Sequence, residues 1–596
     1  MGRGMKCAAC IGFTSVFAAL LVACGGGGSD GAIGAQPTAF ADASRRSSSD
    51  SSLFSTSDST SSTTASFSST STSTGTGNYT LLAWNDLGMH CVDGKDYSVF
   101  SILPPYNNLH AQLVSKAGGG LVTSGVTLTY ESLADSTGSI NTSSVKKTNF
   151  WTWVKSLFGV TLAPDIGLQG NATTSKTPRP MSFDNTNKWF VAEGIPITPY
   201  DDNLKKNFYP MVKVVAKDAS GKILATARTV LPVSDEMTCK ACHASSTVSS
   251  AAKPAGGWVN DSDAEKDWKK NILRLHDEKQ VNDRAFTEAL TKKGYKATGL
   301  LATANAGQPV LCAACHSSNA LPGTGLAGVE PLTQALHTLH ARVQDPTSLT
   351  LQTLGDSTNR TACYMCHPGS VTQCLRGPMG NALDASGKPA MNCQSCHGGM
   401  AAVGSSTRTG WLDQPTCQSC HHDRKREISS LSAGGALNVW VDQRFASNAN
   451  TPAAGFNLYR FSTGHGGLQC ESCHGATHAE YPSSQVNDNV LSKDVQGHTG
   501  TIAECTACHA TVPTTVKGGP HGMHTTGSAW VSSHHDYAKG TALTDCAYCH
   551  GSDYRGTALS QVKMAKTFAI DDGRTKTYTA GQKVSCYDCH NGPTGD

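Results

Sequence analysis

A five-residue pattern, Cys-x-x-Cys-His, occurs nine times between Cys239 and His590. Two cysteines three positions apart, followed at once by histidine, form the attachment site of c-type haem. The two thiols become thioethers to the porphyrin, and the histidine ligates the iron from the proximal side. The predicted attachment residues are Cys239, Cys242, Cys312, Cys315, Cys363, Cys366, Cys393, Cys396, Cys417, Cys420, Cys470, Cys473, Cys505, Cys508, Cys546, Cys549, Cys586 and Cys589. The predicted proximal ligands are His243, His316, His367, His397, His421, His474, His509, His550 and His590.

Zinc is the main alternative, because zinc sites also use closely spaced cysteine pairs. A zinc site does not require histidine directly after every second cysteine, whereas all nine copies here have it. The nine copies also contain 18 of the 23 cysteines in the chain. The pattern therefore favours nine covalently bound haem c groups over zinc.

A six-coordinate haem iron needs a second, distal ligand, and thirteen of the 22 histidines remain once the nine proximal ones are assigned. Nine distal ligands are needed, so ligation of every iron by two histidines is possible. The expected distal ligands come from His276, His337, His340, His422, His465, His478, His498, His521, His524 and His534.

Some of these histidines have a suggestive position in the sequence. His465 and His478 flank Cys470–His474, and His498 shortly precedes Cys505. His422 directly follows proximal His421, so we expect it to serve a neighbouring iron rather than the same one.

Methionine is the competing axial ligand. Because histidines are sufficient in number, we interpret the methionines near the motifs as packing residues, with one exception allowed; they are Met365, Met379, Met391, Met400 and Met523. His90 and His110 lie far from any motif and are interpreted as ordinary core or surface histidines. His535 is not expected to be a ligand if His534 is one.

The N-terminal segment has the features of an export signal. Arg3 and Lys6 precede an apolar run that is too short to span a bilayer as a helix. Residues 1–23 are therefore expected to be a signal peptide. Residues 24–77 are rich in glycine, serine and threonine, and such a composition predicts a flexible tether.

The remaining chain divides into two regions of different character. Residues 78–235 contain no haem motif, and their short runs of Val, Thr, Tyr and Leu predict an all-β, sandwich-like domain. The expected strands are Tyr79–Trp84, Leu121–Tyr130, Trp189–Ala192, Tyr209–Ala216 and Lys222–Pro232. A turn at Asp218–Gly221 is expected to join the last two.

Residues 236–596 contain all nine motifs and predict a loop-rich, mainly α-helical cytochrome c domain whose core consists largely of porphyrin. Two longer helices are expected, over Asp261–Lys292 and Pro331–Val343. The second carries His337 and His340 on one face, where each can point to a different haem.

Two further features concern partners and cross-links. Cys91 and Cys374 are left outside the motifs, so a disulfide between the two regions is possible in an oxidising compartment.

The formal charge of +3 falls to +1 when Arg3 and Lys6 are removed (3 − 2). Nine ferric haems would add roughly −9 through their propionates. The mature protein should be acidic, which disfavours nucleic acid as a partner.

The chain resembles the outer-surface multihaem c-type cytochromes of metal-reducing bacteria. The resemblance rests on the density of haem motifs, on a lipobox-like Leu21-Val22-Ala23-Cys24, and on phrases such as Pro520-His521-Gly522-Met523-His524. It implies that Cys24 is lipidated and holds the protein at the outer membrane. The cell surface is the expected side, with the periplasmic face as the alternative. It also implies electron transfer to extracellular metal oxides, other cytochromes or redox proteins.

Three functions stay open at this point. The first is an electron carrier with a chain of haems, each ligated by two histidines. The second is a multihaem reductase, which would need one iron with an open coordination position. The third is an adhesive or structural surface protein whose β-domain binds a partner or mineral. All nine motifs end in histidine, so no unusual proximal ligand marks a catalytic haem, and no enzyme activity is predicted.

Overall fold

The computed structural model describes residues 77–594, except 408–458 and short gaps at 238, 319, 370, 385, 515–517, 526, 540 and 571–572. The signal peptide, the tether up to residue 76, Cys24, the motif Cys417–His421 and His422 lie outside the described residues. The described chain belongs to one compact unit, Ser71–Asp596.

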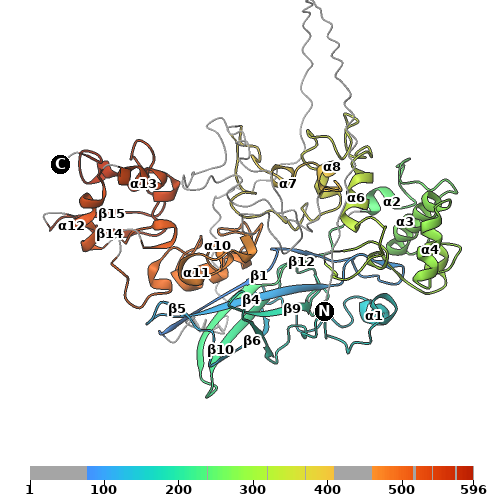
Figure 1. The fold of residues 1–596 in the computed structure, drawn as a ribbon, viewed down its shortest axis with the longest axis horizontal. Coiled ribbons are helices and arrows are strands. Elements are labelled where there is room, and N and C mark those ends of the chain that lie inside the picture. Colours follow the sequence, from blue (N-terminus) through green and yellow to red (C-terminus); the bar gives the residue numbers. More distant parts are fainter. Residues whose placement is uncertain are drawn as a thin grey trace, which may run out of the picture. The chain divides into compact units, whose positions relative to one another are not determined.

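The N-terminal region consists mainly of antiparallel β-sheets (Figure 1). One sheet has the strand order β1-β4-β9-β8, with β5 also paired to β4, and the other has the order β11-β10-β6-β7. The strands of the first sheet are β1 (Tyr79–Asn85), β4 (Tyr106–Ser115), β5 (Gly120–Leu121), β8 (Ser182–Asp184) and β9 (Trp189–Pro196). Those of the second are β6 (Val126–Leu133), β7 (Arg179–Pro180), β10 (Met211–Asp218) and β11 (Ile223–Val230).

Side chains from both sheets meet in one hydrophobic cluster. Leu81 and Leu109 of the first sheet and Val212 and Val214 of the second are among its buried members. Residues two apart along a strand point to the same face, so the strand pattern found in the sequence brings these side chains together. The two sheets therefore share one hydrophobic core.

The five predicted strands all contain β-structure, although Leu121–Tyr130 divides into β5 and β6. The predicted turn is present, because the Gly221 amide donates to the Asp218 carbonyl at 2.9 Å and β10 and β11 pair on either side. The two longest elements that the prediction missed are the strand β4 and the helix α1 (Phe150–Phe158). Helix α1 buries Phe150, Val154 and Leu157, a spacing of three and four residues that indicates an amphipathic helix.

The remainder of the described chain is rich in loops and short helices. Its helices are α2 (Lys240–His243), α3 (Ala264–Gln280), α4 (Arg284–Lys292), α5 (Leu300–Asn305), α6 (Leu332–His340), α7 (Cys393–His397), α8 (Met400–Val403), α10 (Cys470–His474), α11 (Val490–Gln496), α12 (Ser528–Tyr537) and α13 (Thr541–His550). Two-stranded pairs join β2 (His90–Cys91) to β12 (Val233–Ser234), β3 (Phe100–Ser101) to β13 (Val310–Leu311), and β14 (Lys566–Ala569) to β15 (Thr575–Tyr578). No helix among the described residues has both the length and the apolar character needed to cross a bilayer.

The helix predicted over Asp261–Lys292 is wrong in one respect, because it is two helices. Helix α3 ends at Gln280, and the Asp283 side chain accepts from the Ala285 amide to cap the start of α4. Aspartate at this position satisfies an amide that has no partner within the helix, so it favours a new start over continuation. The second predicted helix is present as α6.

One face of the first sheet packs against haem-motif segments. Strand β1 is buried along almost its whole length, which requires cover on both faces. Leu82 and Val114, on the face opposite the shared core, pack against Leu468, Ile502 and Ala507. The Gln469 amide also donates to the Gln112 side chain at 2.9 Å. The β-region therefore supports the haem-motif region directly.

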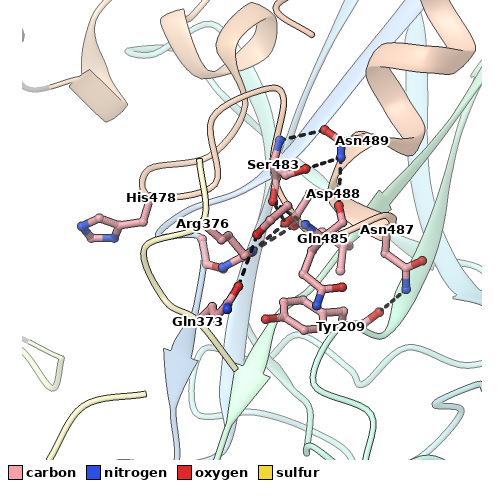
Figure 2. A network of polar contacts seen from close by, with 12 residues as sticks. Tyr209, Gln373, Arg376, His478, Ser483, Gln485, Asn487, Asp488 and Asn489 are labelled. Carbon is pink, nitrogen blue, oxygen red and sulfur yellow. Dashed lines mark hydrogen bonds and ion pairs between the residues drawn. The ribbon is translucent and has the colours of Figure 1, made fainter. Parts of the chain in front are cut away.

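A buried polar network strengthens this junction (Figure 2). The Arg376 guanidinium forms two hydrogen bonds to the Asp488 carboxylate, at 2.6 and 2.9 Å, and donates a third to the Gly88 carbonyl at 2.6 Å. The Arg376 and Asp488 side chains are 0% and 2% exposed. The backbone amides of Arg376 and Gly377 both donate to the His478 carbonyl, so the network holds the loop that carries this histidine.

Gly88 is required at this junction for two reasons. Its φ is +74°, and a Cβ placed there would overlap the Thr477 carbonyl next to His478. We expect Gly88→Ala to destabilise the protein by about 2–5 kcal/mol, the sum of a left-handed backbone cost and a steric overlap. Gly125 is the matched control, because its φ is +71° but a Cβ would enter open space. Gly125→Ala should lower the free energy of unfolding by only about 1–2 kcal/mol. Chemical unfolding checks both, and equal losses would contradict the steric argument.

Candidate functional site

Each described motif folds into a single tight turn. The amide of the motif histidine donates to the carbonyl of the first cysteine in, for example, Cys239–His243 at 3.0 Å and Cys363–His367 at 2.9 Å. Residues three and four apart lie on the same side of such a turn. The local fold thus presents two thiols and one imidazole together, as covalent haem attachment needs.

All eight described proximal histidines lie opposite one other histidine. The pairs are His243 with His340, His316 with His276, His367 with His337, His397 with His478, His474 with His521, His509 with His465, His550 with His524, and His590 with His534. Their ring centroids are 5.7 to 6.4 Å apart. We call each one a histidine pair and name it by its proximal member.

This separation fits one metal between two imidazoles. An imidazole nitrogen ligates a first-row metal at about 2.0 Å, and the ring centroid lies about 1.1 Å farther back, so two opposed ligands would have centroids about 6.2 Å apart. Among the described residues, no three His, Cys, Asp or Glu side chains form a group that could hold a metal ion by themselves. Haem iron needs only two protein ligands, because the porphyrin supplies the other four. The pairs therefore fit haem and not a zinc site of three or four protein ligands.

Backbone carbonyls orient several of these rings. The Nδ1 atoms of His316, His550 and His590 donate to the carbonyls of Glu330, Val584 and Gly592 at 2.8, 3.0 and 2.6 Å. On the distal side, the Nδ1 atoms of His337, His340, His524 and His534 also donate to backbone carbonyls. A hydrogen bond at Nδ1 sets the tautomer that leaves Nε2 free to ligate a metal.

Burial keeps many of the paired imidazoles neutral. Desolvation lowers the pKa of each of five paired histidines to about 4; these are His243, His276, His367, His474 and His478. Burial also lowers the pKa of His337, His524 and His550. Neutral imidazole is the form that ligates iron.

Eight of the ten predicted distal histidines belong to a pair. His422 lies outside the described residues, and His498 is not paired. Instead, His498 donates from Nδ1 to the Thr499 carbonyl at 3.0 Å and contacts the Glu504 carboxylate through Nε2 at 3.4 Å. Both of its nitrogens therefore contact protein groups, and its role as a haem ligand stays a prediction.

The distal partners are not the nearest histidines in the sequence. His465 and His478 flank Cys470–His474, yet they pair with His509 and His397. His474 pairs with His521 instead, 47 residues later in the chain.

The histidines left unpaired differ in their surroundings. His535 has a 65% exposed side chain beside Asp536, as expected for a histidine that is not a ligand. His90 and His110 are buried, and burial lowers the pKa of each to about 4. His90 Nε2 and both ring nitrogens of His110 have no hydrogen-bond partner. These two imidazoles are thus neutral.

Cys91 and Cys374 are not bonded to each other in this structure, and the disulfide between them stays a prediction. The Arg376 network two residues after Cys374 already joins the two regions without a covalent bond.

The histidine pairs are linked to one another through shared elements. Helix α6 carries His340 of the His243 pair and His337 of the His367 pair. Other links join further motifs: the side chains of Cys363 and Cys393 interact, and Cys473 and Cys508 pack against one hydrophobic cluster. His550 Nδ1 also donates to the Val584 carbonyl in the loop just before Cys586.

Three further links complete the connection. Cys239 and Cys312 pack against the same hydrophobic cluster. His478 of the His397 pair is four residues from His474, and His521 and His524, three residues apart, serve the His474 and His550 pairs. All eight described pairs therefore form one connected series.

Comparisons with protein-family models, with curated proteins and with solved structures gave no match to this chain.

Proposed function

We propose that this protein is a multihaem c-type cytochrome that conducts electrons along a series of haems, each ligated by two histidines. The observation that carries the proposal is the set of eight histidine pairs with centroids 5.7 to 6.4 Å apart, each built on a Cys-x-x-Cys-His turn. Bound iron supplies a one-electron change of valence. The chain's own residues attach the porphyrins, occupy both axial positions and exclude water from the irons.

An unbroken series of neighbouring sites supports conduction over isolated haem binding. Each described pair shares a helix, a loop or a cysteine contact with at least one other, so porphyrins attached there would be neighbours. At the eight described sites a second histidine faces each motif histidine, which supports a carrier over a reductase, because substrate reduction at iron needs an open position. An adhesive role for the β-region has less support, because one face of its first sheet is buried against the haem motifs.

The proposed cellular role rests on the sequence. A lipid at Cys24 would anchor the protein to the outer membrane, and the tether would let the folded unit reach partners. We propose electron exchange with other cytochromes or redox proteins on one side and extracellular metal oxides or similar acceptors on the other.

Haem counting tests the proposal directly. The purified protein should carry nine covalent haems by mass spectrometry and accept nine electrons in a reductive titration. Its ferric spectrum should be low-spin. Replacing Cys505 and Cys508 together with serine should remove one haem and one electron, whereas Cys374→Ser should remove none. Fewer than nine haems in the unsubstituted protein, or a high-spin ferric signal, would count against the bis-histidine carrier and favour the reductase.

A further inference from the structure

An indole ring lies between two histidine pairs. Trp530, on α12, stacks on His524 with the ring centroids 3.6 Å apart and the planes inclined by only 7°. Its ring also stacks on His534, with centroids 5.2 Å apart and an angle of 30°. His524 belongs to the His550 pair and His534 to the His590 pair. One tryptophan thus contacts the distal imidazoles of two different haem sites.

The same residue restrains His534 through its backbone. Trp530 and His534 are four residues apart on α12 and lie on one face of the helix. His534 Nδ1 contacts the Trp530 carbonyl at 3.1 Å and the Val531 carbonyl at 3.0 Å. His524 Nδ1 donates to the Thr525 carbonyl at 3.0 Å, so its ring is held by one hydrogen bond and by the indole face.

The two sites beside Trp530 share an uncommon geometry. The imidazole planes are inclined by 14° in the His550 pair and by 25° in the His590 pair. Only one other described pair, that of His367, is nearly parallel, at 16°. The other five described pairs have angles from 51° to 81°.

Ring orientation matters because an imidazole bound to iron can rotate about its iron–nitrogen bond. Neighbouring groups that hold the ring therefore set the angle between the two axial planes. This angle determines how the two ligands split the iron d orbitals. Near-parallel and steeply inclined planes consequently give low-spin ferric signals of different shape in electron paramagnetic resonance.

We propose that Trp530 is a shared positioning residue that holds the distal imidazoles of the His550 and His590 sites in near-parallel alignment with their proximal partners. The inference rests on the proposed function, since it concerns ligands of bound haem. It adds that one side chain outside the haem motifs orients the ligands of two sites together.

The test compares Trp530→Leu, which removes the stacking face, with Trp530→Phe, which keeps an aromatic ring. Trp258→Leu is the control, because Trp258 is half-buried and stacks on no ring among the described residues. Each variant is first shown by mass spectrometry to carry the same number of haems as the unsubstituted protein. Electron paramagnetic resonance of the ferric proteins is then compared, with potentials from a redox titration as a second readout.

We expect Trp530→Leu to remove near-parallel signal equal to two haems, while Trp530→Phe and Trp258→Leu keep it. If Trp530→Leu does not accumulate with its haems, Trp530→Met takes its place, since methionine fills space without an aromatic face. Unchanged signals in the Leu or Met variant, or an equal change in the Trp258→Leu control, would overturn the inference. Failure of the proposed function would look different, as missing haems or high-spin iron in the unsubstituted protein.

Discussion

Replacing Arg376 with methionine is expected to destabilise the protein by about 3–5 kcal/mol, because it leaves the Asp488 carboxylate buried without its ion-pair partner. Both side chains are almost fully excluded from solvent, at 0% and 2% exposure. The Ser483 hydroxyl donates to Asp488 at 2.6 Å, but one neutral donor does not replace a guanidinium. Guanidinium unfolding of the haem-loaded protein, followed by circular dichroism, measures the loss.

Two controls separate burial from simple loss of charge. Arg228 makes the same two-bond contact with Asp494, but its side chain is 46% exposed. Arg228→Met should therefore lower the free energy of unfolding by no more than about 1 kcal/mol. The double variant Arg376→Met with Asp488→Leu should recover part of the loss, because no unpaired charge stays buried. Equal costs for Arg228→Met and Arg376→Met would show that burial of the pair is not what matters.

His337→Ala and His340→Ala, the two histidine variants of α6, are each expected to convert one haem from low-spin to high-spin. The affected haem should differ between the two variants. His337 lies 6.0 Å from His367 and His340 lies 6.4 Å from His243, measured between ring centroids. Alanine has no atom that can ligate iron, so the affected site would lose its distal ligand while its thioethers and proximal histidine stay in place. Each single variant should lose about one ninth of the low-spin signal, and the double variant twice that amount.

Electron paramagnetic resonance distinguishes the two sites as well as counting them. His337→Ala should remove a near-parallel signal, because its pair is inclined by 16°, whereas His340→Ala should remove a steeply inclined one, at 68°. His535→Ala, at an exposed histidine outside every pair, is the control and should change neither. The assignment fails if both variants remove the same signal, or if neither yields high-spin iron while all haems stay attached.

The β-region shows which strands can be predicted from local sequence and which cannot. Enrichment in Val, Thr, Tyr and Leu predicted the strands near β1, β9, β10 and β11, because these residues favour a half-buried sheet. Strand β4 was missed because polar residues such as Asn107, His110 and Gln112 interrupt the apolar pattern. Those side chains are buried all the same, since haem-motif segments and loops cover that face and supply contacts such as the one between Gln112 and Gln469. Sequence alone does not reveal that cover.

The sequence by itself predicted which cysteines would attach haem and which histidine of each motif would be proximal. Both depend on residues within five positions, and a single helical turn brings those residues together whatever the rest of the chain does. Only the tertiary structure decided the distal partners. Those imidazoles approach from the opposite side of the site, so they come from distant segments such as His521 for His474 and His478 for His397. Their placement depends on long-range contacts, among them the Arg376 network that holds the His478 loop, and no local spacing encodes such contacts.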